Sequence, residues 1–188
     1  QSGHIAAVGY ELYCTLLEQE TKKLKNEPII EPAKTHLELP ISGQIPKRYI
    51  KADKQRMEMY RRLSRATSLG ALDEVIASMT DAYGQPPEAV DRFIQLAELR
   101  IAASTLGIEL IKLEKPDLIF TTSEPQRLEP ALKEAPGRVS VIDDRTVYYR
   151  PPENYLDPPE TLLAVLRKLL VRPLREREQA PSPVPAET

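Results

Sequence analysis

The hydrophobic residues between positions 53 and 106 recur at steps of three and four, a spacing that predicts three consecutive amphipathic helices. Asp53 is suited to cap the first helix and Ser68 the second, because their side-chain oxygens can accept hydrogen bonds from free backbone amides. Gly84 suits the left-handed position that ends the second helix, and Pro86-Pro87 marks the start of the third. The third helix is apolar on more than one side, so we expect it to be the central one.

The pattern becomes strand-like after Gly107, with short runs rich in Ile, Leu, Phe and Thr. Strands are predicted at residues 34–41, 108–113, 118–122, 138–142 and 146–149, the last two joined as a hairpin by Asp143-Asp144-Arg145. Ser123 with Gln126, and Asp157 with Glu160, have capping-box spacing and predict two later helices. The predicted class is α+β, with the block of three helices packed on a small mixed, mostly antiparallel sheet.

The chain divides by its pattern into three parts. Residues 1–30 hold an amphipathic helix, predicted over residues 5–24, and the beginning of a proline-marked linker. Residues 31–174 form the predicted α+β domain. From residue 175 the chain turns polar and rich in proline, which predicts a disordered tail over residues 175–188. The abrupt start at Gln1-Ser2-Gly3-His4 indicates a fragment of a longer polypeptide.

Composition narrows the classes of function. The 188 residues carry a formal net charge of -2, so no global positive field attracts nucleic acid, and any such contact has to be local. Charged residues make up 29% and hydrophobic ones 41%, which is typical of a globular protein, and no apolar run is long enough to span a membrane. The single cysteine, Cys14, excludes an internal disulfide framework and favours a reducing, cytoplasmic location.

Residues suited to catalysis or metal binding are scarce. Neither a Walker pattern nor a Gly-x-Gly-x-x-Gly run occurs, so the chain alone is not expected to bind ATP or another cofactor. His4 and His36 lie too far from each other and from Cys14 for zinc-ligand spacing, and no metal site is predicted. Cys14 falls among apolar residues of the first helix, where a small buried side chain is the usual explanation. No catalytic residue is assigned.

One dense basic run is the main positive feature. It comprises Lys47, Arg48, Lys51, Lys54, Arg56, Arg61, Arg62 and Arg65. Of these, Arg61, Arg62 and Arg65 are candidate nucleic-acid contacts, because guanidinium groups bind phosphates. Glu58 lies three and four residues before two of them, so helix pairing can occupy part of the run, and a solvated helix face remains the other interpretation.

Asp81 lies near the predicted end of the second helix. A negative charge there opposes the helix dipole by roughly a few tenths of a kcal/mol. Contact with another surface would account for the residue, and chance accounts for it about equally well.

Several short motifs, taken in order, resemble the C-terminal domain of the bacterial transcription-repair coupling factors, the Mfd family. The motifs are Tyr60-Arg61-Arg62-Leu63, Asp81-Ala82-Tyr83-Gly84 with Pro86-Pro87, Leu99-Arg100 and Leu106-Gly107-Ile108. The start, Gln1-Ser2-Gly3-His4-Ile5 with Val8-Gly9-Tyr10-Glu11-Leu12-Tyr13, resembles the segment that joins the family's motor to this domain. The resemblance covers the chain from its start to about residue 111, and beyond it only the order of strands and helices agrees.

The resemblance implies a role without catalysis for this part of the chain. The family's motor is a RecG-like superfamily 2 translocase that uses ATP and magnesium to move on duplex DNA, displaces stalled RNA polymerase and recruits nucleotide excision repair. The C-terminal domain packs on the N-terminal UvrB-like module of the same polypeptide and masks its surface for UvrA. By this resemblance Asp81 matches an acidic contact position, Ser78 stands where glutamate is usual, and Gln1 and His4 are remnants of the translocation motif.

Two other functions remain open at the level of sequence. A DNA-contacting accessory domain would use the basic stretch at residues 47–65. A small hydrolase would need Cys14 activated by His4 or His36.

Overall fold

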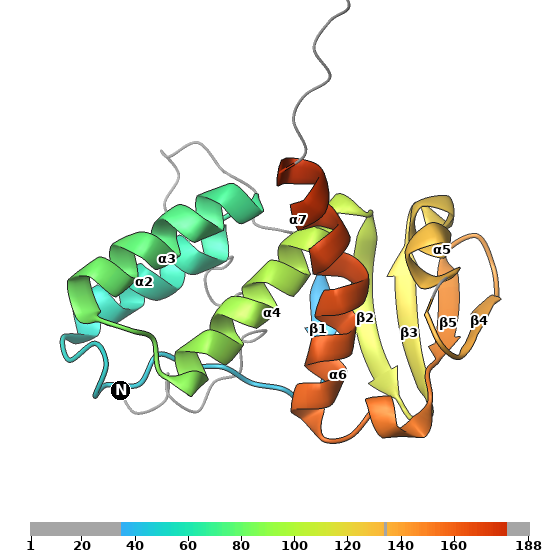
Figure 1. Cartoon of the computed structure of the whole chain (residues 1–188), viewed down its shortest axis with the longest axis horizontal. Coiled ribbons are helices and arrows are strands. Elements are labelled where there is room, and N and C mark those ends of the chain that lie inside the picture. The colour runs from blue at the N-terminus through green and yellow to red at the C-terminus, as the bar shows by residue number, and fades with distance from the viewer. Residues whose placement is uncertain (1–34, 134, 180–188) are drawn as a thin grey trace, which may run out of the picture.

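The computed structural model describes residues 35–133 and 135–179, which form an α+β fold with helices at one end and a sheet at the other (Figure 1). The helices are α2 (Asp53–Arg65), α3 (Leu69–Tyr83), α4 (Glu88–Thr105), α5 (Pro125–Lys133), α6 (Pro159–Leu166) and α7 (Arg172–Gln179), with a 3-10 turn η2 (Glu153–Tyr155) and a π-helical segment η3 (Arg167–Val171). The strands are β1 (His36–Glu38), β2 (Ile108–Glu114), β3 (Asp117–Thr122), β4 (Arg138–Val141) and β5 (Thr146–Arg150). The helix predicted over residues 5–24 lies outside the described residues.

The three predicted consecutive helices are confirmed as α2, α3 and α4. Ser68 caps α3, since its Oγ accepts a hydrogen bond from the backbone N–H of Ala71 at 3.1 Å. Gly84 follows α3 with a φ of 83°, a backbone conformation that glycine adopts without strain. The prediction for Asp53 was wrong: Ala52 is the N-cap of α2, and the Asp53 carboxylate instead accepts from Arg56 Nη2 at 2.6 Å.

Helix α4 is the central helix, as expected, and joins the two ends of the fold. Its first half packs on α2 and α3, where Phe93 meets Tyr60 edge-on at 5.2 Å between ring centroids. Its second half packs on β2, α6 and η3. An extended segment crosses α4 at Gly43, where a side chain would bring its Cβ within 2.2 Å of the Phe93 backbone nitrogen. Only glycine permits this close crossing.

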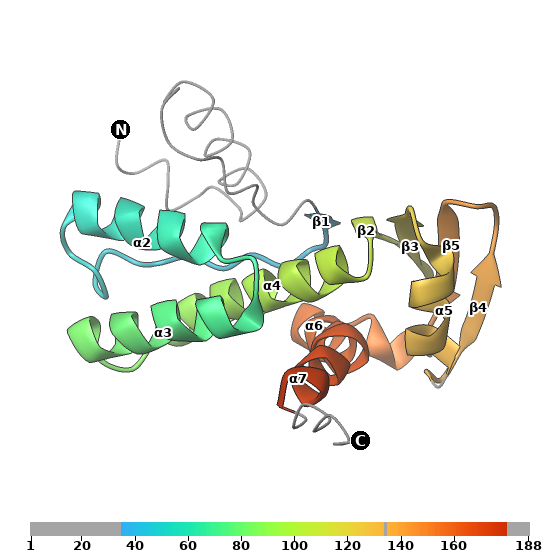
Figure 2. The same ribbon diagram turned by 90° about the horizontal axis from the view of Figure 1, so that it is seen from above.

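The sheet is mixed and mostly antiparallel, as predicted, with strand order β1-β2-β3-β5-β4. Only β1 runs parallel to its neighbour, β2, and the hairpin of β4 and β5 is confirmed. Helices α4, α5 and α6 lie on one face of the sheet (Figure 2). The buried side chains Leu118, Phe120, Val147 and Tyr149 alternate with half-buried ones, so one face of the sheet belongs to the core.

Two predicted helix caps were wrong because their side chains have partners elsewhere. The Ser123 hydroxyl donates to the backbone oxygen of Gly107 at 3.4 Å, and α5 begins only at Pro125. The Asp157 carboxylate pairs with Lys115 Nζ at 2.5 Å, and α6 begins at Pro159 without a side-chain cap. Capping-box spacing therefore located the helices but not the contacts that begin them.

The predicted tail also needs a correction. Residues 175–179 are not disordered but complete α7, which ends at Gln179, while residues 180–188 lie outside the described residues. The physical reason is tertiary contact: Leu174 packs against the core, and Arg175 reaches two carboxylates on other helices.

Candidate interdomain interface

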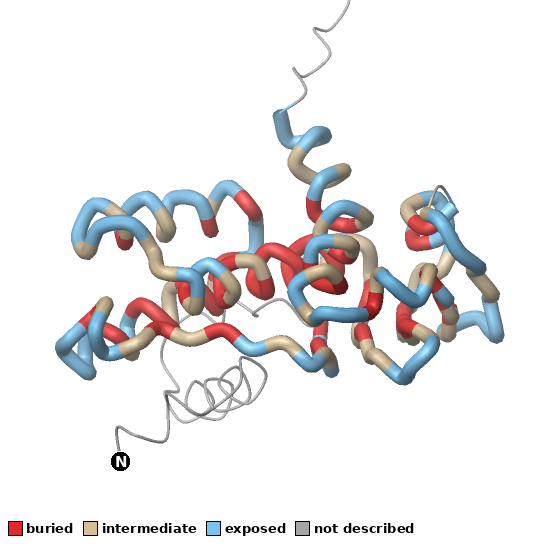
Figure 3. Tube along the Cα trace, turned by 60° about the horizontal axis from the view of Figure 1, so that its bottom comes forward, coloured by how far each residue is buried: buried red, intermediate tan, exposed pale blue. Residues whose placement is uncertain are grey.

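Helix α3 presents an outer face to solvent. Glu74, Ala77, Ser78 and Asp81 are exposed, and their spacing of three and four residues places them on one side of the helix. The buried residues of α3, Leu69, Leu72 and Met79, point the other way. Figure 3 shows α3 as the mostly exposed helix at the upper left, beside the mostly buried α4. We refer to these four exposed residues as the outer face of α3.

The outer face carries two carboxylates without partners. Within residues 35–133 and 135–179, neither Glu74 nor Asp81 forms an ion pair or a side-chain hydrogen bond. Asp81 lies in the last turn of α3, where the helix dipole disfavours negative charge, and no basic residue occupies that turn. Its charge is therefore left available to a partner outside the described part of the chain.

The structure brings two sets of predicted site residues together. Arg62 Nη1 donates to Ser78 Oγ at 3.3 Å, a long contact that joins α2 to the outer face. Arg61 pairs with Glu58 at 3.5 Å, as the sequence spacing suggested. Arg65 is half-buried and also has an interaction within the protein. The three candidate nucleic-acid contacts are thus engaged within the fold.

The exposed cations lie instead in the turn before α2 and at the start of that helix. Lys47, Arg48, Lys51 and Lys54 are all exposed and, in the part of the chain that the structure describes, none of them forms an ion pair. Tyr49 anchors this turn at the end of α3, since its hydroxyl donates to the Gly84 backbone oxygen at 2.7 Å. Its ring also meets Tyr83 edge-on at 6.0 Å, and burial raises the pKa of the Tyr49 hydroxyl.

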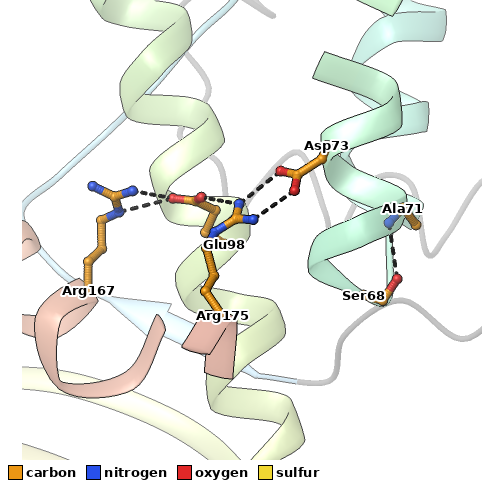
Figure 4. A network of polar contacts seen from close by, with 6 residues as sticks. All are labelled: Ser68, Ala71, Asp73, Glu98, Arg167 and Arg175. Atoms are coloured by element: carbon orange, nitrogen blue, oxygen red, sulfur yellow. Dashed lines mark hydrogen bonds and ion pairs between the residues drawn. The ribbon is translucent and has the colours of Figure 1, made fainter. Parts of the chain in front are cut away.

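A network of charges reaches α3 at Asp73, beside the outer face (Figure 4). Arg175 binds Asp73 with two hydrogen bonds, of 2.7 and 2.9 Å, and donates to Glu98 at 2.6 Å. Glu98 also accepts two hydrogen bonds from Arg167, at 3.0 and 2.5 Å, and only 7% of its side chain is exposed. The hydrogen bond to Asp73 is the main cause that raises the pKa of Arg175 above its ordinary value.

Sequence reasoning missed this network. A signal was present at Glu98, a carboxylate between the buried Leu96, Ala97 and Leu99 of α4, because a charge in such a position needs a cationic partner. The partners themselves come from residues 69 and 77 positions away. The sequence pattern carries no information on contacts at that separation.

The described residues show no arrangement suited to metal binding: no group of three or more His, Cys, Asp or Glu side chains converges among them. His36 is exposed on β1. Gln1, His4 and Cys14, for which a translocation role or a nucleophile role was considered, lie outside the described residues. Within the described chain, no helix has the length and apolar character needed to span a bilayer.

Fold and surface together define an α+β domain that presents an exposed helix face with two carboxylates. The family model of the TRCF domain matches residues 39–132, half of the chain, and the chain belongs to this family.

Relatives of this chain are transcription-repair-coupling factors. The protein from Bacillus subtilis is 29% identical over 130 residues, which cover 69% of this chain and 11% of that protein. The one from Mycobacterium bovis is 32% identical over 139 residues, which cover 62% of this chain and 11% of that protein. The chain therefore spans only about a ninth of the length of these relatives.

A solved structure supports the fold. The crystal structure of a C-terminal domain of transcription-repair coupling factor superposes with a TM-score of 0.64 and covers 78% of this chain and 96% of that domain. Sequence identity is 14%, so this likeness concerns the fold alone.

Proposed function

We propose that this chain is a regulatory interaction domain of a transcription-repair coupling factor. Its partner is the N-terminal UvrB-like module of the same polypeptide, and its outer face of α3 masks the surface of that module that binds UvrA. The observation that supports this most directly is the pair of exposed carboxylates Glu74 and Asp81, which have no ion-pair partner among the described residues and lie on a helix held by the core on its other side.

The whole protein, on this proposal, is a cytoplasmic, ATP- and magnesium-dependent translocase on duplex DNA that displaces stalled RNA polymerase and recruits nucleotide excision repair. ATP, UvrA, the polymerase and DNA belong to other parts of that protein, and this chain is no enzyme by itself. Its role is to keep the factor repressed until the polymerase is engaged.

Charge complementarity decides the chemistry of the contact. The outer face offers Glu74 and Asp81, with the small side chains of Ala77 and Ser78 between them. Small side chains let a partner approach closely, and carboxylates favour arginine, whose fork can bind them with two hydrogen bonds. Ser78 is shorter than the glutamate usual in the family and is already held by Arg62, so Asp81 carries more of the contact here.

Binding of this chain to the separately produced UvrB-like module tests the proposal. Asp81→Arg is expected to weaken binding at least tenfold, because it replaces attraction by repulsion of like charges. Glu129→Arg is the matched control: it makes the same charge change at an exposed position of α5, far along the chain from α3. No binding of the unaltered chain at high micromolar concentration, or equal loss with both variants, would refute the proposal.

A second candidate function is the binding of DNA, through other residues than the three arginines considered from the sequence. The four exposed cations at residues 47–54 would bind DNA in place of Arg61, Arg62 and Arg65, because among the described residues none of the four forms an ion pair. Duplex DNA bound through them should lose affinity with salt at a slope of roughly -0.9 per phosphate contact on logarithmic axes. Reversal of Lys47, Arg48, Lys51 and Lys54 should abolish that binding, and no binding at low salt would exclude this function.

A further inference from the structure

Helix α3 is held by few contacts for its length. Of its fifteen residues, three are buried. The polar side-chain contacts that join it to other helices in the described structure are Asp73 with Arg175 and Ser78 with Arg62. Asp73 and Ser78 are five residues apart, or about 140° around a helix, so they are held from nearly opposite sides.

The contact from Arg175 is the stronger of the two. It consists of two charge-assisted hydrogen bonds at 2.7 and 2.9 Å, whereas the Arg62 contact is a single bond of 3.3 Å to a neutral hydroxyl. Nη2 of Arg175 also donates to Oε1 of the nearly buried Glu98, at 2.6 Å. A guanidinium that already donates to one nearly buried carboxylate loses little further freedom when it binds Asp73.

The π-helical segment η3 explains how two arginines reach one carboxylate. Arg167 and Arg175 are eight residues apart, which on a regular α-helix places them about 80° apart around the axis. A π-turn contains more residues than an α-turn, because its hydrogen bonds join residues five apart. Since η3 lies between them, at Arg167–Val171, it turns Arg175 back towards the side of Arg167, where both bind Glu98.

We propose that α7 is a latch that sets the position of α3, with Arg175 as the positioning residue. Arg175 ties the N-terminal part of α3 to α4 through Asp73 and Glu98, and thereby fixes the orientation of the outer face, which is centred about a quarter turn further around the helix. The latch is a property of the domain itself. Its consequence for partner binding rests on the proposed function.

Hydrogen exchange of the α3 amides tests the latch without any partner. Arg175→Gln is expected to speed exchange in residues 69–83 on the order of tenfold, because a charge-assisted contact that limits local opening is lost. Amides of β2 and β3 should exchange as before. Arg172→Gln is the matched control, since Arg172 lies on the same helix and its ion pair among the described residues is with Glu176, four residues on. Equal α3 exchange in Arg175→Gln and the unaltered chain, or an equal increase throughout the domain, would overturn the latch.

Two further variants separate positioning from a general loss of stability. Arg175→Lys keeps a positive charge beside Glu98 but cannot bind Asp73 through a fork, so α3 exchange should rise while the sheet stays protected. Asp73→Asn should affect α3 as Arg175→Gln does, and the double variant should add little to either change. Full additivity of the two changes would show that the pair does not act as a unit, and would overturn the proposal.

Binding to the UvrB-like module then distinguishes the two proposals. Arg175→Gln should weaken binding several-fold without removing any residue of the outer face. Asp81→Arg should weaken binding without speeding α3 exchange, because a positive charge in the last turn suits the helix dipole. If the unaltered chain does not bind but its α3 exchange still responds to Arg175→Gln, the proposed function fails and the latch stands. If Arg175→Gln binds as tightly as the unaltered chain, the positioning role is refuted.

Discussion

Helices α3 and α4 are neighbours in the chain and in space, yet they differ in almost every physical respect. Eleven of the eighteen residues of α4 are buried, against three of the fifteen in α3. Helix α4 contacts helices on both sides and the sheet, whereas α3 packs on α2 and α4 and leaves its outer face exposed. The difference separates two tasks: α4 holds the fold together, and α3 presents a surface to another molecule.

The largest effect should come from the centre of α4. Phe93 is fully buried and meets Tyr60 edge-on, so Phe93→Ala should lower the free energy of unfolding by about 3–5 kcal/mol. Urea denaturation followed by circular dichroism measures the change. Ala77→Gly on the exposed face of α3 should cost only about 1 kcal/mol. Comparable losses in the two variants would contradict the division between the helices.

The buried carboxylate of α4 should matter next. Glu98→Gln removes the carboxylate charge that Arg167 and Arg175 share, and should cost about 1–3 kcal/mol. The matched control is Glu74→Gln on α3, an exposed position where the change should stay within about 0.5 kcal/mol. The same denaturation experiment compares them, and an equal effect of both would mean that the network adds nothing to stability.

The cap of α3 offers a smaller but sharper test. Ser68→Ala removes the hydrogen bond to the Ala71 amide and should cost about 0.5–2 kcal/mol. Ser123→Ala is the control, because Ser123 was also predicted to cap a helix but its hydroxyl donates to the backbone oxygen of Gly107 instead. If the α3 amides in Ser68→Ala exchange no faster than in Ser123→Ala, the cap is not what begins α3.

The smallest change in stability should come from an ion pair on the sheet, and it should depend on pH. Hydrogen bonds from Arg150, at 2.8 and 2.7 Å, lower the pKa of Asp117, so the folded protein favours the ionised form. Stability from this pair is present above the unfolded pKa of about 3.9 and is lost as the pH falls through the lower folded value. Asp117→Asn should therefore cost up to about 1 kcal/mol at pH 7. Thermal unfolding from pH 7 to about 2 should show the difference vanish in acid, and a constant difference would contradict the assignment.

The same two helices show what sequence can predict. Helix α3 could be located because its signals are local: Ser68 begins it, Gly84 ends it, and the hydrophobic spacing between them marks its buried side. The central position of α4 followed from apolar residues on more than one side. Asp81 and Ser78 were singled out by resemblance, and the structure places them on one exposed face, while their contact with a partner stays a prediction.

Contacts between distant residues could not be predicted. Arg175 was assigned to a tail because its neighbours are polar, although its partners are Asp73 and Glu98, 102 and 77 residues earlier. Ser123 and Asp157 have the spacing of caps, but in the fold their side chains reach Gly107 and Lys115. In each case the neighbouring residues in the sequence did not determine the contact of the side chain. The contact depends on the tertiary structure.

The position of α4 has a consequence for how the domain unfolds. At about 1.5 Å per residue it is roughly 27 Å long, and one helix thereby contributes to the core at both ends of the molecule. If α4 came away, the hydrophobic core at both ends of the molecule would be exposed to water. Residues 35–133 and 135–179 should consequently melt in a single cooperative transition, and the two ends should not behave as separately folding domains.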